Sequence, residues 1–68
     1  MDEMIFEVEL APEGGLTARA LGESIFTQAP DMATLHVNVR EAVHTHFDEG
    51  AAPKMIRLHY VRDEVIAA

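Results

Sequence analysis

Apolar residues recur at every second position near the start of the chain, and this spacing predicts a half-buried strand. The apolar positions are Met4, Phe6, Val8 and Leu10. Because the side chains of a strand point alternately to its two faces, these residues share one face. Glu7 and Glu9 then lie together on the opposite, polar face.

Two more strands are predicted downstream of a glycine turn. Residues 11–15, APEGG, are typical of a hairpin, since glycine adopts the positive φ values that a tight turn requires. Residues 16–21 alternate again, until Gly22 interrupts the pattern, and residues 24–28, SIFTQ, predict a short third strand. The second strand has Leu16, Ala18 and Ala20 on one face, and Thr17 and Arg19 on the other. Three consecutive strands with short connections form an antiparallel meander.

The hydrophobic period changes after Pro30, which predicts an amphipathic helix over residues 31–49. Asp31 is suited to cap its N-terminus, and Gly50 is placed to end it. The predicted apolar stripe consists of Met32, Leu35, Val39, Ala42, Val43 and Phe47. Such a helix is expected to cover one face of the sheet.

Residues 54–62 return to alternation and predict a fourth strand. One face carries Ile56, Leu58 and Tyr60, and the other carries Arg57, His59 and Arg62. Residues 63–68, DEVIAA, either fray or continue the strand. The expected fold is a single α+β domain over residues 1–68, in the order β-β-β-α-β. If the last strand returns beside the first, those two are parallel, and the third and fourth strands form open edges for pairing with other chains.

Size and charge narrow the possible partners. A chain of 68 residues buries a small core, and without cysteine it has no disulfide to support that core, so we expect a homodimer or higher oligomer. The net charge of −7 opposes direct binding of nucleic acid. We expect no membrane span and no signal peptide, and therefore a cytoplasmic location.

Residues 26–31, FTQAPD, lead without a gap into a helical stretch that contains NVREAV at residues 38–43. These motifs resemble the HicB-like antitoxin N-terminal domain family, and the resemblance spans nearly the whole chain. FTQAPD stands where that family has a V-T-Q-G-D-T step, and NVREAV matches its helix pattern N-I-K-E-A-I. Residues 13–15, EGG, match its hairpin turn, whereas the loop at residues 21–23 is shorter than usual. The resemblance implies a partial ribonuclease-H-like fold that binds and masks a small basic ribonuclease toxin of the HicA type. Full HicB antitoxins carry a further DNA-binding domain, which has no counterpart here, so the resemblance covers the partner-binding half alone.

Histidines are the first candidates for chemistry, since three of four fall in the predicted helix. His36, His44 and His46 lack the i, i+4 spacing with which two imidazoles bind one metal ion. We expect His36 and His46 to pack, hydrogen-bonded, at the edge of the core, and His44 to face solvent. His59 on the fourth strand would have to approach the helix to complete a metal site. We therefore predict no metal and no cofactor.

No catalytic constellation stands out among the remaining residues. Glu7 and Glu9 share a strand face, but such polar faces are more often solvated or in contact with a partner, and Ser24 has no neighbouring His and acid in the sequence. A weak hydrolase therefore has little support, and we expect a protein that is not an enzyme. The expected partner contacts are Glu7, Glu9, Arg57 and His59. The alternative is a small oligomeric domain that binds a metabolite or assists a larger enzyme complex.

Overall fold

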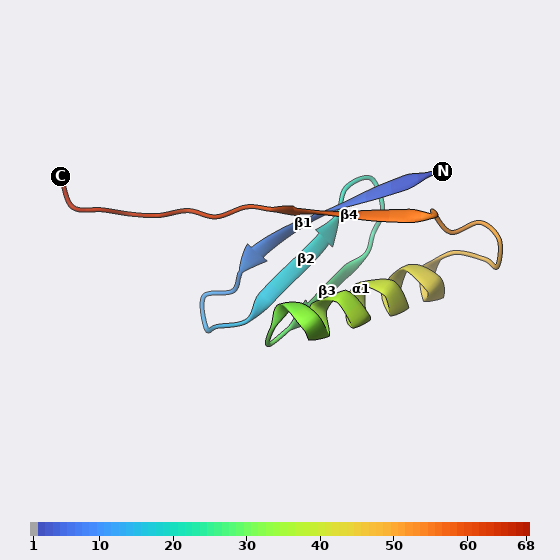
Figure 1. Cartoon of the computed structure of the whole chain (residues 1–68), viewed down its shortest axis with the longest axis horizontal. Coiled ribbons are helices and arrows are strands. Elements are labelled where there is room, and N and C mark those ends of the chain that lie inside the picture. Colours follow the sequence, from blue (N-terminus) through green and yellow to red (C-terminus); the bar gives the residue numbers. More distant parts are fainter. Residues whose placement is uncertain (1) are drawn as a thin grey trace.

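The computed structural model describes residues 2–68 as one mixed sheet with one helix against it (Figure 1). Strands β1 (Glu3–Leu10), β2 (Leu16–Ala20) and β3 (Phe26–Ala29) precede helix α1 (Met32–His46), and β4 (Met55–Tyr60) follows it. The strands lie in the order β3-β2-β1-β4, with β1 antiparallel to β2 and parallel to β4. The α+β class, the element order and the pairing of the first strand with the last are confirmed. No helix in this part of the chain is long and apolar enough to cross a membrane.

The β1–β2 hairpin depends on glycine at one position in particular. The N–H of Ala11 donates to the carbonyl oxygen of Gly15, and the N–H of Gly14 donates to that of Ala11, both at 3.0 Å. Gly15 has φ +82°, and a Cβ added there would lie 2.8 Å from the carbonyl oxygen of Ala29. A side chain at Gly15 would therefore be opposed both by its own backbone conformation and by the adjacent strand.

Helix α1 begins where the sequence predicts and ends earlier. The side chain of Asp31 accepts a hydrogen bond from the Thr34 N–H at 2.7 Å, which caps the first turn and lowers the pKa of this carboxyl group. The prediction that the helix reaches residue 49 and stops at Gly50 is wrong. Phe47 leaves the helix with φ −101° and ψ 148°, and its half-buried ring packs against the core. Gly50, at φ +85°, serves the turn that follows.

The core lies between α1 and the sheet, and α1 covers only part of the sheet. Helix α1 packs on β2 and β3, with no Cα of β1 or β4 close beneath it. The fully buried side chains of the core are Phe6, Val8, Leu35, Val39 and Val43. Burial of each such side chain contributes roughly 1.5–3 kcal/mol. Beyond the helix, the residues of β4 that face the same side are only half-buried or exposed, including Tyr60 at 44% exposure.

Strand β4 is shorter than the predicted residues 54–62. The N–H of Val61 still donates to the carbonyl oxygen of Val8 at 2.8 Å, which extends the backbone pairing by one residue. The rest of the chain runs on as an extended tail, shown in red in Figure 1, and Val65 is 95% exposed. Arg62 belongs to this tail, so its predicted place on a strand face with Arg57 and His59 is wrong.

Candidate partner-binding surface

The four predicted contact residues lie on the sheet face that α1 leaves open. Met4, Phe6 and Val8 turn toward the helix, so the alternate residues of β1, Glu7 and Glu9 among them, turn away from it. Glu7 faces His59 in the parallel register of β1 and β4, and Ile5 faces Arg57. The structure therefore brings Glu7, Arg57 and His59 together on neighbouring strands, with Glu9 farther along the same face.

Two cross-strand ion pairs occupy part of this outer sheet face. Arg19 of β2 donates from Nη2 to Oε1 of Glu7 at 3.3 Å, and Arg57 of β4 pairs with Glu3 of β1. Both pairs are largely exposed, and such pairs contribute about 0–1 kcal/mol. Their main effect is on charge, because they neutralise two of the carboxylates of β1 and leave Glu9 at its far end.

Large apolar side chains are also exposed on the outer sheet face, and the sequence interpretation did not single them out. Phe26 of β3 is 62% exposed and Met55 of β4 is 66% exposed. Phe26 faces Arg19 in the β2–β3 register, which places it on the same side as Glu7. Ile25 and Phe26 are adjacent apolar residues at the start of a strand, and adjacent side chains of a strand point to opposite faces. Because Ile25 is buried, Phe26 points outward.

The three histidines of α1 lie in different surroundings. His46 at the end of α1 lies 3.2 Å from Oε2 of Glu23, and its ring meets that of Phe47 edge-on with the centroids 5.0 Å apart. This agrees with the packing and hydrogen bonding predicted for His46. His36 is exposed instead of packed, beside Val39 at a groove next to β4, and His44 is exposed as predicted.

His59 does not approach the helix, which the alternative of a metal site would have required. Ile56, Leu58 and Tyr60 occupy the helix side of β4, and alternation therefore turns His59 to the outer sheet face beside Glu7. Within residues 2–68, no three side chains of His, Asp or Glu gather closely enough to hold a metal ion.

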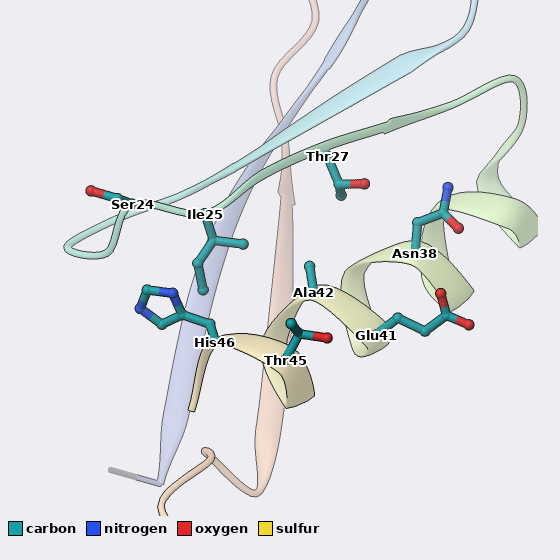
Figure 2. A pocket seen from close by; sticks show the side chains of 8 residues that line it. All are labelled: Ser24, Ile25, Thr27, Asn38, Glu41, Ala42, Thr45 and His46. Atoms are coloured by element: carbon teal, nitrogen blue, oxygen red, sulfur yellow. The ribbon is translucent and has the colours of Figure 1, made fainter. Parts of the chain in front are cut away.

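A shallow hollow of about 620 Å³ lies between β3 and α1 and has a polar rim (Figure 2). The Asn38 amide group donates to the carbonyl oxygen of Gln28 at 3.0 Å and so is already engaged. In Figure 2 the hydroxyl of Ser24 points away from the helix, so Ser24 and His46 do not form a nucleophile–base pair directed into the hollow. The hollow offers hydrogen-bonding groups at its rim without a catalytic arrangement.

A second groove, of about 310 Å³, follows the boundary between α1 and β4. It is lined by His36, Val39, Arg40, Ile56 and Leu58. Its floor is apolar because α1 lies over β2 and β3 and leaves Ile56 and Leu58 of β4 only half-buried. We call it the α1–β4 groove.

Two relatives match most of the chain. A UPF0150 protein of Archaeoglobus fulgidus is 51% identical over 55 residues, which cover 81% of this chain and 82% of the relative. A UPF0150 protein of Thermotoga maritima is 37% identical over 65 residues, which cover 96% of this chain and 91% of the relative. This chain belongs to the UPF0150 family.

The family name states no activity, ligand or partner. No protein-family model matches the chain. No solved structure matches it either. In both UPF0150 relatives the matched segment takes up most of the protein, so these relatives have lengths similar to this chain.

Proposed function

We propose that this UPF0150 chain is a non-catalytic, homo-oligomeric protein-binding module of the HicB-like antitoxin type. Its partner would be a small basic ribonuclease of the HicA type, which it masks by covering the surface that acts on RNA. The main support is the charge distribution: the net charge is −7, and within residues 2–68 no polar or charged residue is buried. The acidic groups are therefore at the surface, where they attract a basic protein.

The hairpin end of the sheet is the favoured contact for the basic partner. The carboxylates of Glu3 and Glu7 are paired with arginines. Glu9 and Asp63 line one small hollow together with Leu10, Val61 and Arg62, so that two carboxylates outweigh one guanidinium group there. Leu10 is exposed there, and Glu13 lies in the adjoining hairpin. Negative charge around an exposed apolar side chain suits a basic surface with an apolar centre.

In this function the chain carries out no reaction on its partner. In the hollow between β3 and α1, the Asn38 amide is already hydrogen-bonded to Gln28 and the Ser24 hydroxyl points away from the helix. Inhibition by coverage needs only complementary shape and charge. The fold also agrees with the HicB-like arrangement, in which a meander is followed by one helix and a returning strand.

The test is reconstitution with a small basic ribonuclease of the HicA type. We expect a stable complex that suppresses cleavage of RNA by that protein and that weakens as salt is raised. The double variant Glu9→Lys/Asp63→Lys should weaken the complex at least tenfold. Asp48→Lys/Glu49→Lys changes the net charge equally at another place and should weaken it much less. Absence of binding at low salt, or undiminished cleavage in the complex, would contradict the proposal.

A second candidate is a small oligomeric domain that binds a metabolite or assists a larger enzyme complex. The observation in its favour is the α1–β4 groove, whose volume of about 310 Å³ is at the low end for ligand pockets. Native mass spectrometry of the chain purified from its own cells distinguishes the two candidates. A small molecule retained at a fixed stoichiometry would favour this second function.

A further inference from the structure

We infer that two copies of the chain pair through the free edges of β4, antiparallel and centred on Leu58, so that two sheets become one continuous sheet. The occupant of the β4 edge is thus a second copy of this chain. The inference deepens the homo-oligomeric part of the proposed function and rests on that part alone. It requires neither a toxin nor any ligand.

The backbone of β4 presents a regular row of free hydrogen-bonding groups. The N–H of Met55 donates to the carbonyl oxygen of Asp2 at 3.0 Å, and the N–H of Val61 donates to that of Val8 at 2.8 Å. Odd-numbered residues of β4 therefore turn their backbone groups toward β1. Because these groups alternate along a strand, Ile56, Leu58 and Tyr60 turn N–H and C=O to the open edge.

These backbone groups restrict the possible registers of an antiparallel pair. Reciprocal hydrogen bonds form only where two outward-turned residues face each other. The paired stretch of β4 runs from Met55 to Val61, and its central residue is Leu58. A two-fold axis at Leu58 pairs this whole stretch with itself, with Leu58 on Leu58 and Ile56 on Tyr60 of the second copy.

The side chains favour the same register on the helix side of the sheet. Within each copy Phe6 faces Leu58, and Val8 faces Tyr60. Pairing at Leu58 therefore joins the two apolar rows into one, running from Phe6 through both Leu58 residues to Phe6 of the second copy. Tyr60 of the second copy lies beside Ile56, which lines the α1–β4 groove. The half-buried residues of β4 thereby acquire apolar neighbours that α1 does not provide.

The neighbouring registers are less favourable. An axis at Arg57 would place two guanidinium groups directly opposite each other at the close, non-hydrogen-bonded spacing, which is unfavourable. An axis at His59 would place Ile56 opposite Arg62. Met55, the first residue of β4, would then face residue 63 of the tail instead of a residue of the partner's strand. The axis at Leu58 instead sets Arg57 opposite His59 of the second copy, which faces Glu7 of its own β1.

The opposite edge of the sheet is a poorer site for pairing. Strand β3 has four residues, against six for β4. Short edge strands are among the devices that limit edge-to-edge association, and β4 has no proline, glycine or bulge that would serve the same purpose. The exposed tail is the remaining competitor, because Val65 and Ile66 of a second copy are also apolar and unpaired.

Sedimentation equilibrium of matched variants tests which surface carries the assembly. We expect the unmodified chain to be a dimer of the 7.5-kDa subunit. Tyr60→Glu should raise the dissociation constant at least a hundredfold, while its far-ultraviolet circular dichroism stays unchanged. Phe26→Glu likewise replaces an exposed aromatic ring with a carboxylate on β3, and a chain cut after residue 62 lacks the tail; both should remain dimeric. Dissociation by either of these last two changes, with Tyr60→Glu still dimeric, would overturn the inference, as would a monomeric unmodified chain.

The register can be read by disulfide formation, since the chain has no cysteine of its own. Facing residues at Leu58 would have Cα atoms about 5.5 Å apart, within reach of a disulfide. Leu58→Cys should therefore crosslink to itself on mild oxidation. Arg57→Cys and His59→Cys should crosslink to each other when mixed, and each far less when alone. Efficient self-crosslinking at position 57 or 59, or none at position 58 with the fold intact, would contradict the register.

Salt separates failure of this inference from failure of the proposed function. Two chains of net charge −7 repel each other, and β4 pairing is mainly apolar and backbone-mediated, so added salt should strengthen the dimer. The complex with a basic partner should weaken over the same range. A dimer that dissociates as salt is raised would contradict β4 pairing without bearing on partner binding.

Discussion

The side-chain amide of Asn38 donates a hydrogen bond to the carbonyl oxygen of Gln28 at 3.0 Å. This bond joins the middle of α1 to β3, the edge strand whose own outer backbone has no further strand beside it. It also sits at the rim of the polar hollow in Figure 2. Asn38 therefore has a structural role that its place on the polar side of the helical pattern did not reveal.

Replacement of Asn38 should show that its donor group matters. Asn38→Ala removes a partly exposed hydrogen bond and should lower the free energy of unfolding by about 0.5–1.5 kcal/mol. Asn38→Asp keeps the shape but places a carboxylate against a carbonyl oxygen, so at pH 7 it should be the more destabilising change. Chemical denaturation of both variants measures this. If the deficit of Asn38→Asp does not shrink when acid protonates the new carboxyl group, the interpretation is wrong.

Alanine at Gly15 should destabilise the hairpin more than alanine at Gly14. Both glycines have positive φ, which costs an L-residue about 1–2 kcal/mol, but only the Cβ at Gly15 would meet the carbonyl oxygen of Ala29, at 2.8 Å. The space around Gly14 is open. The difference in melting temperature between the variants isolates this contact. Equal losses would mean that β3 shifts away without cost.

The cap at Asp31 should make stability depend on acid. Its pKa is lowered chiefly by the hydrogen bond from the Thr34 backbone N–H, so the unfolded chain takes up a proton more readily than the folded one. The stabilisation is therefore complete above the ordinary value of 3.8 and is lost as pH falls through the lower folded value.

Melting curves of the unmodified chain and of Asp31→Asn across this acidic range test the assignment. Asparagine is an equally good cap without a titrating group, so its contribution should not change with pH. Asp31→Ala should lower the melting temperature at neutral pH, and Asp31→Asn much less. Parallel acid profiles for the unmodified chain and Asp31→Asn would contradict the role of the carboxylate.

Truncation of Leu35 should be far more costly than truncation of Val37. Leu35 is fully buried between α1 and the sheet, whereas Val37, two residues later, is 45% exposed. Leu35→Ala leaves a cavity and should cost about 2–5 kcal/mol, against less than about 0.5 kcal/mol for Val37→Ala. Urea denaturation compares the two within one helix. Similar losses would indicate that the exposed side of α1 that carries Val37 is covered in solution.

The sequence predicts the faces of the strands better than their lengths. The alternation around Phe6 and Val8 is unambiguous, because a strand buried on one face leaves a period of two in its residue types. The end of α1 was missed because Gly50 carries a helix-stop signal that in fact serves the next turn, while Phe47 is drawn to the core. Burial of a particular ring depends on the tertiary fold and has no local signature.

The candidate surface was predictable in part. The shared face of Glu7 and Glu9 follows from alternation within β1, and the position of His59 opposite Ile56 and Leu58 follows from alternation within β4. The pairing of Arg57 with Glu3 required the β1–β4 register, which is set by a crossover through the whole helix. No pattern within β1 or β4 specifies that register by itself.

The parallel contact between β1 and β4 has a consequence for biosynthesis. Glu3 is made before the helix, whereas its neighbour Met55 is made only after it. Pairings between distant segments form slowly, and this one cannot begin while translation is still under way along α1. Until then β1 has a free backbone edge. Premature termination before β4 would therefore release an aggregation-prone fragment instead of a smaller folded domain.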